Sequence, residues 1–210
     1  MYLVINYFTL NLEHWALVTF WILYCVLHSF LADAIVKEQI EIFLGDKFRY
    51  YRLAYSVFAS VMLVGILSYQ LSITSSLLFL NTYIQLGVSF FFLIPGIIIM
   101  IICIKKYFYE LSGIQALQKK EPHVTLQQKG LHKHIRHPLY LGTLLFVWGL
   151  FLMFPLLSNT VACIVITAYV LIGIQLEEKK LIIEFGEDYR RYKKTVPMLV
   201  PDFNKSSGKK

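Results

Sequence analysis

Five long apolar stretches alternate with polar connections along the chain. Each has 17 or more residues without Lys, Arg, Asp or Glu; they are Trp15–Leu31, Leu53–Leu71, Tyr83–Ile104, Leu139–Pro155 and Thr160–Leu176. A helix crosses the ~30 Å hydrocarbon layer of a bilayer in about 17–25 residues. The pattern therefore predicts an all-α, polytopic membrane protein with about five transmembrane helices.

Composition supports this prediction. Apolar residues make up 57% of the 210 positions and charged residues 16%, and the mean hydropathy is +0.60. A soluble domain averages about 45–50% apolar and about 25% charged residues, so a soluble enzyme, a coiled coil and a disordered tail are excluded. The first Lys is Lys37, so the first stretch lacks the basic start of a signal peptide. The cysteines Cys25, Cys103 and Cys163 lie inside apolar stretches, where they fit as packing residues.

The 20 Lys and Arg residues are confined to three segments. The first connection holds four, the third connection seven and the C-terminal segment nine, whereas the N-terminus and the second and fourth connections hold none. Positive residues stay on the cytoplasmic side. The distribution predicts an outside N-terminus and a cytoplasmic C-terminus, which requires an odd number of spans.

The same pattern divides the chain into three parts. Residues 1–104 form a membrane domain with three spans. Residues 105–201 hold a loop, the last two spans and a cytoplasmic C-terminal helix, and residues 202–210 form a frayed basic tail. This basic surface suits anionic lipid headgroups. Nucleic acid is not expected as a partner, because topology already explains the cations.

Polar residues gather at the cytoplasmic edge in two stretches, 130–142 and 175–192. The short connection Leu156–Asn159 makes the last two spans an antiparallel hairpin. From His137 to Pro155 and from Asn159 to Glu177 are both 18 steps, so each leg is roughly 27 Å long at 1.5 Å per residue. We therefore expect His137 and Glu177 at similar depth on neighbouring helices.

These residues predict a site for an amino-acid zwitterion. Pro138 suits the first turn of a helix, and the free N–H groups of that turn, with Arg136 and His137, can bind an anion. Tyr140 follows, and Gly142 permits close approach of a ligand or a backbone. Glu177 offers a carboxylate to a cation.

Simpler interpretations exist for several of these residues. Glu177 and Glu178 fit equally well as a helix end that pairs with nearby Lys, and Arg136 and His137 as part of the topological signal. The cluster His132, His134 and His137 has no Cys or carboxylate at ligand spacing, so no metal site is predicted. His28 fits best as a packed, hydrogen-bonded histidine.

An ordered set of motifs resembles the isoprenylcysteine carboxyl methyltransferase superfamily. The set comprises Arg136-His-Pro-x-Tyr-x-Gly142, Glu177-Glu-x-x-Leu181, Phe185-Gly-x-x-Tyr-x-x-Tyr192 and Val196-Pro197. The superfamily includes phospholipid methyltransferases, methanethiol S-methyltransferases and NnrU-like proteins. The stretches 167–178 and 196–201 are similar to the methanethiol S-methyltransferase branch, as is His28-Ser29 more loosely, whereas the stretch 49–55 departs from it.

The resemblance implies S-adenosylmethionine as methyl donor, bound at the cytoplasmic ends of the last two spans. Carried over by motif, the cofactor residues are Leu126, His132, Arg136, His137, Pro138, Tyr140, Gly142 and Glu177. Glu177 would take the ammonium group, Arg136 and the helix start the carboxylate, and Tyr140 would face the sulfonium. His137 and Tyr140 are the candidates for a catalytic base. The implied location is a bacterial inner membrane, with the active site facing the cytoplasm.

The acceptor implied is a small or lipophilic thiol that enters from the membrane. Carboxyl-methylating members carry an arginine one turn before the acid, and Gly173 stands there in this chain. The alternatives are an isoprenylcysteine carboxyl or phospholipid methyltransferase, an NADPH-dependent membrane reductase, and a non-enzymatic NnrU-like protein. Reductases of this shape usually place an acid after the glycine, where this chain has Thr143. The sequence gives no indication of oligomeric state.

Overall fold

The computed structural model describes residues 10–79, 82–112 and 125–201, and the regular elements in these ranges are helices. They are α1 (Leu12–Ala32), α2 (Ala34–Leu44), the 3-10 helix η1 (Gly45–Tyr50), α3 (Tyr51–Ser72), α4 (Tyr83–Ser112), the 3-10 helix η2 (Gly130–Lys133), α6 (Pro138–Met153) and α7 (Leu157–Thr195). Each of the five apolar stretches lies almost wholly within a helix. The predicted boundary after residue 104 falls inside α4, and the tail 202–210 lies outside the described residues.

Four segments in the described ranges are long and apolar enough to cross a membrane: Leu12–Ala32, Ala34–Ser72, Tyr83–Lys106 and Leu157–Thr195. The chain is an integral membrane protein. The fourth predicted span is shorter than expected, because Pro155 disfavours helix at the preceding residue and α6 ends at Met153. Its 16 residues measure about 24 Å. The count of five spans and the orientation therefore stay predictions.

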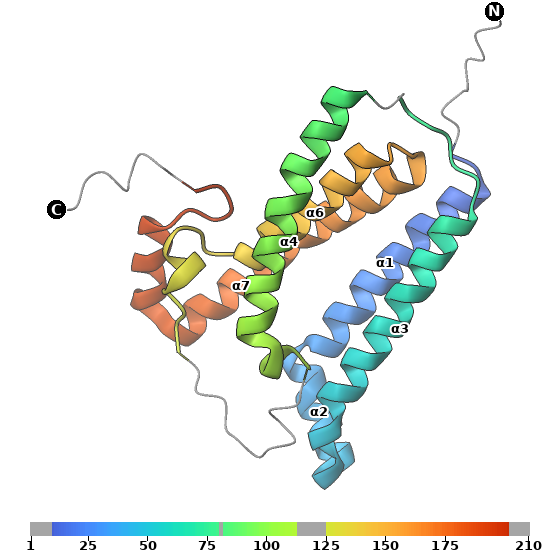
Figure 1. Cartoon of the computed structure of the whole chain (residues 1–210). Coiled ribbons are helices and arrows are strands. Elements are labelled where there is room, and N and C mark those ends of the chain that lie inside the picture. Colours follow the sequence, from blue (N-terminus) through green and yellow to red (C-terminus); the bar gives the residue numbers. More distant parts are fainter. Residues whose placement is uncertain (1–9, 80–81, 113–124, 202–210) are drawn as a thin grey trace, which may run out of the picture.

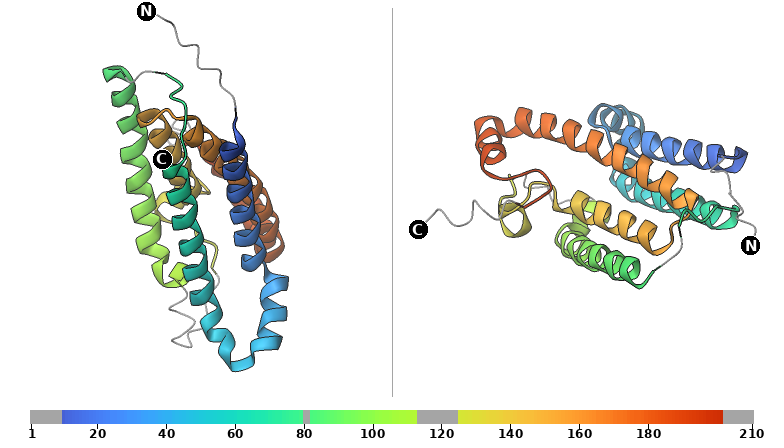
Figure 2. Two further views of the ribbon diagram at one scale, coloured as in Figure 1. Left: turned by 90° about the vertical axis from the view of Figure 1, so that its right-hand side faces the viewer. Right: turned by 90° about the horizontal axis from the view of Figure 1, so that it is seen from above.

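Two helix pairs flank α7. Helices α1 and α3 pack together on one side, α4 and α6 on the other, and α7 contacts both α1 and α6 (Figures 1 and 2). An apolar core of Leu17, Trp21, Ile66, Val161 and Ala162 joins α1, α3 and α7. This arrangement fixes the start of α6 and the distal half of α7 at one end of the molecule.

Glycines allow α4 and α6 to approach closely. A Cβ atom on Gly96 would lie 2.8 Å from the backbone nitrogen of Phe146, and one on Gly142 would lie 3.1 Å from the carbonyl oxygen of Gly96. No larger side chain fits there without a shift of the backbone. The close contact with α4 thus fixes the position of the start of α6.

The two connections that lack Lys and Arg meet at the same end of the molecule. The backbone N–H of Leu78 donates to the carbonyl of Pro155 at 2.8 Å, and that of Leu157 donates to the carbonyl of Ser76 at 3.0 Å. This pairing agrees with the predicted arrangement in which both connections share one side of the membrane.

Gly186 redirects the end of α7. Its backbone is in the left-handed region, with φ 54° and ψ −125°, which glycine adopts without steric cost. The residues after Gly186 turn out of the line of the long helix (Figure 2). Residues 187–198 thereby return to the start of α6.

Candidate functional site

The segment that follows α7 runs beside the start of α6. The backbone N–H of Arg136 donates to the carbonyl of Pro197 at 2.9 Å, and that of His137 donates to the carbonyl of Met198 at 3.2 Å. The Tyr192 hydroxyl donates to the carbonyl of His132 at 2.6 Å. Residues 196–198 therefore act as a strap that closes this end of the molecule, and "the strap" refers to them below.

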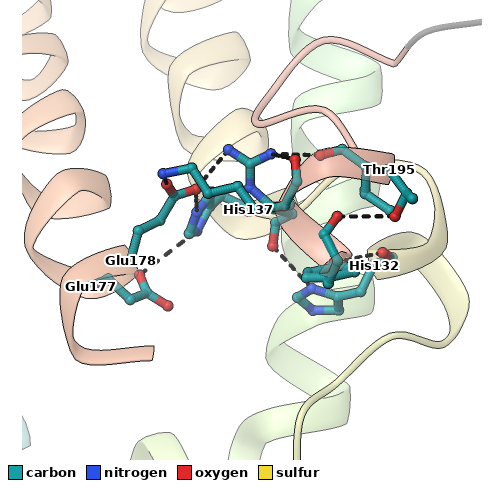
Figure 3. Close-up of polar contacts among 9 residues, drawn as sticks. His132, His137, Glu177, Glu178 and Thr195 are labelled. Atoms are coloured by element: carbon teal, nitrogen blue, oxygen red, sulfur yellow. Dashed lines mark hydrogen bonds and ion pairs between the residues drawn. The ribbon is translucent and has the colours of Figure 1, made fainter. Parts of the chain in front are cut away.

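Glu178 lies at the centre of this region and is only 6% exposed. Its Oε1 accepts from Arg136 Nε at 2.8 Å and Nη2 at 2.7 Å, and from His137 Nε2 at 3.1 Å; its Oε2 pairs with Lys193 Nζ at 2.6 Å (Figure 3). Glu178 follows the apolar part of α7, which ends at Leu176. Burial opposes its ionisation, but the hydrogen bonds from Lys193, His137 and Arg136 prevail and lower its pKa to about 2.

Arg136 is held in place by the same cluster. Its Nη1 donates to the carbonyls of Val196, at 2.5 Å, and Lys193, at 3.1 Å, while Nε and Nη2 engage Glu178. The guanidinium thus joins α7, the strap and the start of α6. In this arrangement Arg136 is a clamp with most of its N–H groups in use, and its role toward a ligand carboxylate stays a prediction.

His137 and Glu177 come together as the hairpin geometry predicted. His137 Nδ1 lies 3.8 Å from Glu177 Oε2, with the two side chains 3% and 44% exposed (Figure 3). Among the described residues, no Lys or Arg forms an ion pair with Glu177. The ring of Tyr140 lies 5.7 Å from that of His137, and the Tyr140 hydroxyl lies 3.8 Å from the position of a Cβ on Gly173.

Pro138 and Gly142 fix the start of α6, which carries the site. Pro138 is in the first turn of α6, as predicted, and α6 begins at N-cap His137 without a side-chain capping bond. Gly142 is buried against α4, where its neighbours are Met100, Gly96 and Ile99. The close approach that Gly142 permits is therefore one of backbone to backbone.

His132 and Leu126 lie near the residues of α7 that precede the strap, Tyr192 and Thr195. His132 Nδ1 is 3.0 Å from the carbonyl oxygen of Arg136, and burial lowers the pKa of His132. Leu126 lines an open depression of about 330 Å³, together with Gln128, Asp188, Arg191, Tyr192 and Thr195. In the part of the chain that the structure covers, no three His, Cys, Asp or Glu side chains gather as a metal site would require.

Sequence reasoning missed the roles of Glu178 and Lys193, which pair at 2.6 Å. A signal for Glu178 exists: Val170, Ile174 and Glu178 are spaced four apart and are 3%, 1% and 6% exposed. The buried face of α7 therefore continues into Glu178 and not into Glu177. Tyr189 is 1% exposed, and its hydroxyl has no hydrogen-bond partner among the described residues.

Comparison with known proteins gives the family. Residues 63–188, more than half of the chain, match the phospholipid methyltransferase family. The chain belongs to this family.

Curated relatives extend the match. A methanethiol S-methyltransferase of Pseudomonas deceptionensis is 39% identical over 48% of this chain and 39% of its own length. One from Pseudomonas sp. (strain GM41(2012)) is 35% identical over 58% of this chain and 48% of its own length. A protein-S-isoprenylcysteine O-methyltransferase of Schizosaccharomyces pombe is 31% identical over 43% of this chain and 38% of its own length.

These relatives confirm the predicted membership of the isoprenylcysteine carboxyl methyltransferase superfamily. The chain spans less than half the length of the curated relatives it matches. No solved structure matches it significantly.

Proposed function

We propose that this protein is an integral-membrane methyltransferase that uses S-adenosylmethionine and methylates the sulfur of a small or lipophilic thiol. One observation carries the proposal. The carboxylate of Glu177, which no Lys or Arg neutralises in the described ranges, lies beside His137 at the uncapped start of α6. A cation receptor and an anion receptor thus stand together, as a zwitterionic amino-acid group requires.

The residues present fit this ligand. The half-exposed Glu177 would bind the ammonium group, and the N–H groups of the first turn of α6 would bind the carboxylate. Arg136 would add positive potential from behind while it stays clamped to Glu178. When bound, S-adenosylmethionine would supply an electrophilic methyl group on its sulfonium.

The depression beside the strap suits the adenosyl part. Leu126 and Tyr192 offer apolar and aromatic surface for a purine, and the Asp188 carboxylate can accept hydrogen bonds from ribose hydroxyls. His132 holds the adjoining loop through the carbonyl of Arg136. Leu126 and His132 would thus shape the adenosyl end, and Glu177 the amino-acid end.

One face of α7 favours a neutral thiol over a carboxylate as the methyl acceptor. Tyr169, Gly173 and Glu177 are spaced four apart and share a helix face, with the Tyr140 hydroxyl beside Gly173 and the Ser29 hydroxyl 3.1 Å from that of Tyr169. Between Tyr169 and Glu177 this face carries no Lys or Arg that could hold an acceptor carboxylate, and Lys180, one turn further along, pairs with Asp33 at 3.1 Å. A thiol must lose its proton to become the nucleophile, and His137 and Tyr140 are the candidates to take it.

Calorimetric binding of S-adenosylmethionine to the purified protein tests the cofactor assignment. Wild type and Glu184→Gln, a matched change on the exposed side of α7, are expected to bind. Glu177→Gln should bind about tenfold or more weakly, because a charge-assisted hydrogen bond contributes about 1.5–3 kcal/mol. Absence of binding by wild type would refute the methyltransferase proposal, and binding of NADPH instead would favour a reductase.

Methyl transfer to methanethiol and to a farnesylcysteine analogue tests the acceptor. The thiol is expected to be preferred by wild type, and Gly173→Arg should lower thiol transfer because the new side chain fills the space beside Tyr140. A wild-type preference for the prenylcysteine carboxylate would refute the thiol assignment. It would favour the carboxyl-methylating alternative, to which the Schizosaccharomyces pombe relative points.

The location and partners follow from the same charges. We propose that the site faces the cytoplasm of a bacterial inner membrane, because the Lys and Arg segments flank it. Anionic lipid headgroups are the proposed neighbours of the basic C-terminal segment.

A further inference from the structure

Both ring nitrogens of His137 face carboxylates. Nε2 lies 3.1 Å from Glu178 Oε1, and Nδ1 lies 3.8 Å from Glu177 Oε2. The two carboxylates differ in kind, because Glu178 is buried and held by Arg136 and Lys193, whereas Glu177 is half exposed. Figure 3 shows the imidazole between the two acids.

The first contact sets the tautomer of His137. Glu178 is ionised beside Arg136 and Lys193, and an ionised carboxylate can only accept hydrogen bonds. His137 must therefore donate from Nε2–H. In the neutral imidazole the other nitrogen then carries a lone pair, so Nδ1 is an acceptor that points toward Glu177.

Two acceptors that face each other require a donor between them. The lone pair on Nδ1 and the Glu177 carboxylate repel when nothing lies between, and 3.8 Å is too long for a hydrogen bond. A primary ammonium group is a cation with up to three N–H donors, so it can donate to both at once. The start of α6 has no side-chain cap, so its backbone N–H groups could bind the carboxylate of the same amino-acid group.

We infer that His137 Nδ1 and Glu177 together form the receptor for a ligand ammonium group, and that Glu178 is the positioning residue that builds it by accepting the proton of His137 Nε2. This inference rests on the proposed function for the identity of the ligand. Other charged or titratable groups face the cluster from its neighbours: Arg136, Lys193, Tyr140, Tyr189 and His132. Of these, Tyr140 donates its hydroxyl to the Glu177 carboxylate, and the carboxylate keeps further lone pairs for an ammonium group.

Ligand pairs that differ only in the amino group test the inference without methyl transfer. The probes are S-adenosylhomocysteine and its des-amino analogue, and the readout is the dissociation constant from calorimetry. Wild type is expected to prefer S-adenosylhomocysteine by about tenfold or more, since a hydrogen bond to a charged group contributes about 1.5–3 kcal/mol. Glu178→Gln should bring the two affinities together, whereas the exposed Glu184→Gln should leave the ratio unchanged.

The tautomer provides a second readout that a purely structural role would not move. In protein labelled with ¹⁵N-histidine, His137 of wild type is expected to show a protonated Nε2 and an unprotonated Nδ1. In Glu178→Gln this bias should be lost, because an amide can either accept from or donate to Nε2. The wild-type spectrum is informative even if Glu178→Gln does not fold.

The outcomes separate the inference from the function. If wild type binds S-adenosylhomocysteine but Glu178→Gln weakens both ligands equally, the cofactor proposal stands and the ammonium receptor is overturned. A protonated Nδ1 in the free protein would also overturn it. If wild type binds neither ligand, the proposed function fails, and the ammonium assignment fails with it.

Discussion

The buried ion pair between Arg136 and Glu178 allows a quantitative test of how this end of the molecule is held. The change is Arg136→Met, which keeps an apolar stem of similar length and removes the guanidinium. Each side chain of the pair is 8% exposed. Breaking a buried pair costs about 3–5 kcal/mol because a charge is left without compensation.

The lower end of this range applies here. Lys193 and His137 still contact Glu178 in the variant, so the carboxylate keeps part of its compensation, while the carbonyl of Val196 loses its donor. A loss of about 3 kcal/mol corresponds to about 6–12 °C in Tm for a chain of this size. Thermal unfolding in detergent measures it.

Arg190→Met is the matched control. Arg190 also pairs with a glutamate on α7, Glu187, at 2.6 Å, but the two side chains are 57% and 65% exposed. Exposed pairs contribute about 0–1 kcal/mol, so the control should lose less than about 4 °C. Equal shifts in the two variants would refute the buried clamp. Raised salt should reduce the decrease in Tm caused by Arg190→Met, because exposed charges are screened, and should not change the decrease caused by Arg136→Met.

Two further predictions concern packing and pH. Gly96→Ala should destabilise the protein by about 1–3 kcal/mol, because the new Cβ would lie 2.8 Å from the backbone nitrogen of Phe146. The control Gly65→Ala has open space around the new Cβ and should be neutral or stabilising. Equal stabilities of the two variants in an SDS-unfolding titration would contradict this prediction. Because burial lowers the pKa of His132, the unfolded chain binds its proton more readily, so stability should fall as pH drops below about 6.5, the ordinary histidine value. His132→Gln should make Tm depend less on pH in this range. An unchanged slope of Tm against pH would refute the assignment to His132.

Much of the fold was predictable from hydropathy alone. All five apolar stretches became helices, because a long run without charges can satisfy its backbone in a membrane only as a helix or in a barrel. The length of α6 was harder to predict, since Leu156 and Leu157 continue the apolar run past Pro155. The helix ends because Phe154, the residue before Pro155, has non-helical backbone angles. Hydropathy carries no information about these angles.

The site was predictable where it depends on helix geometry and not where it depends on side-chain choice. Equal leg lengths brought His137 to Glu177, and this placement is confirmed. The two acids at 177 and 178 are chemically identical in sequence, and only the stripe of Val170 and Ile174 distinguishes the buried one. The clamp on Arg136 was not predictable, because Gly186 reverses the chain and brings the strap to it.

The cluster also explains why a buried acid stands at the end of the molecule where Lys and Arg gather. Positive charges that set orientation need only lie on the correct side, and most of them are exposed. Arg136 and Lys193 are different, because Glu178 binds both and the strap accepts from Arg136. Glu178 therefore ties the end of α7 to the start of α6, and it does so through the same oxygen that orients His137. The stability of this end and the geometry of the proposed receptor thus both depend on the Glu178 carboxylate. Substitutions in the strap should therefore alter the position of His137 through Arg136 and Glu178.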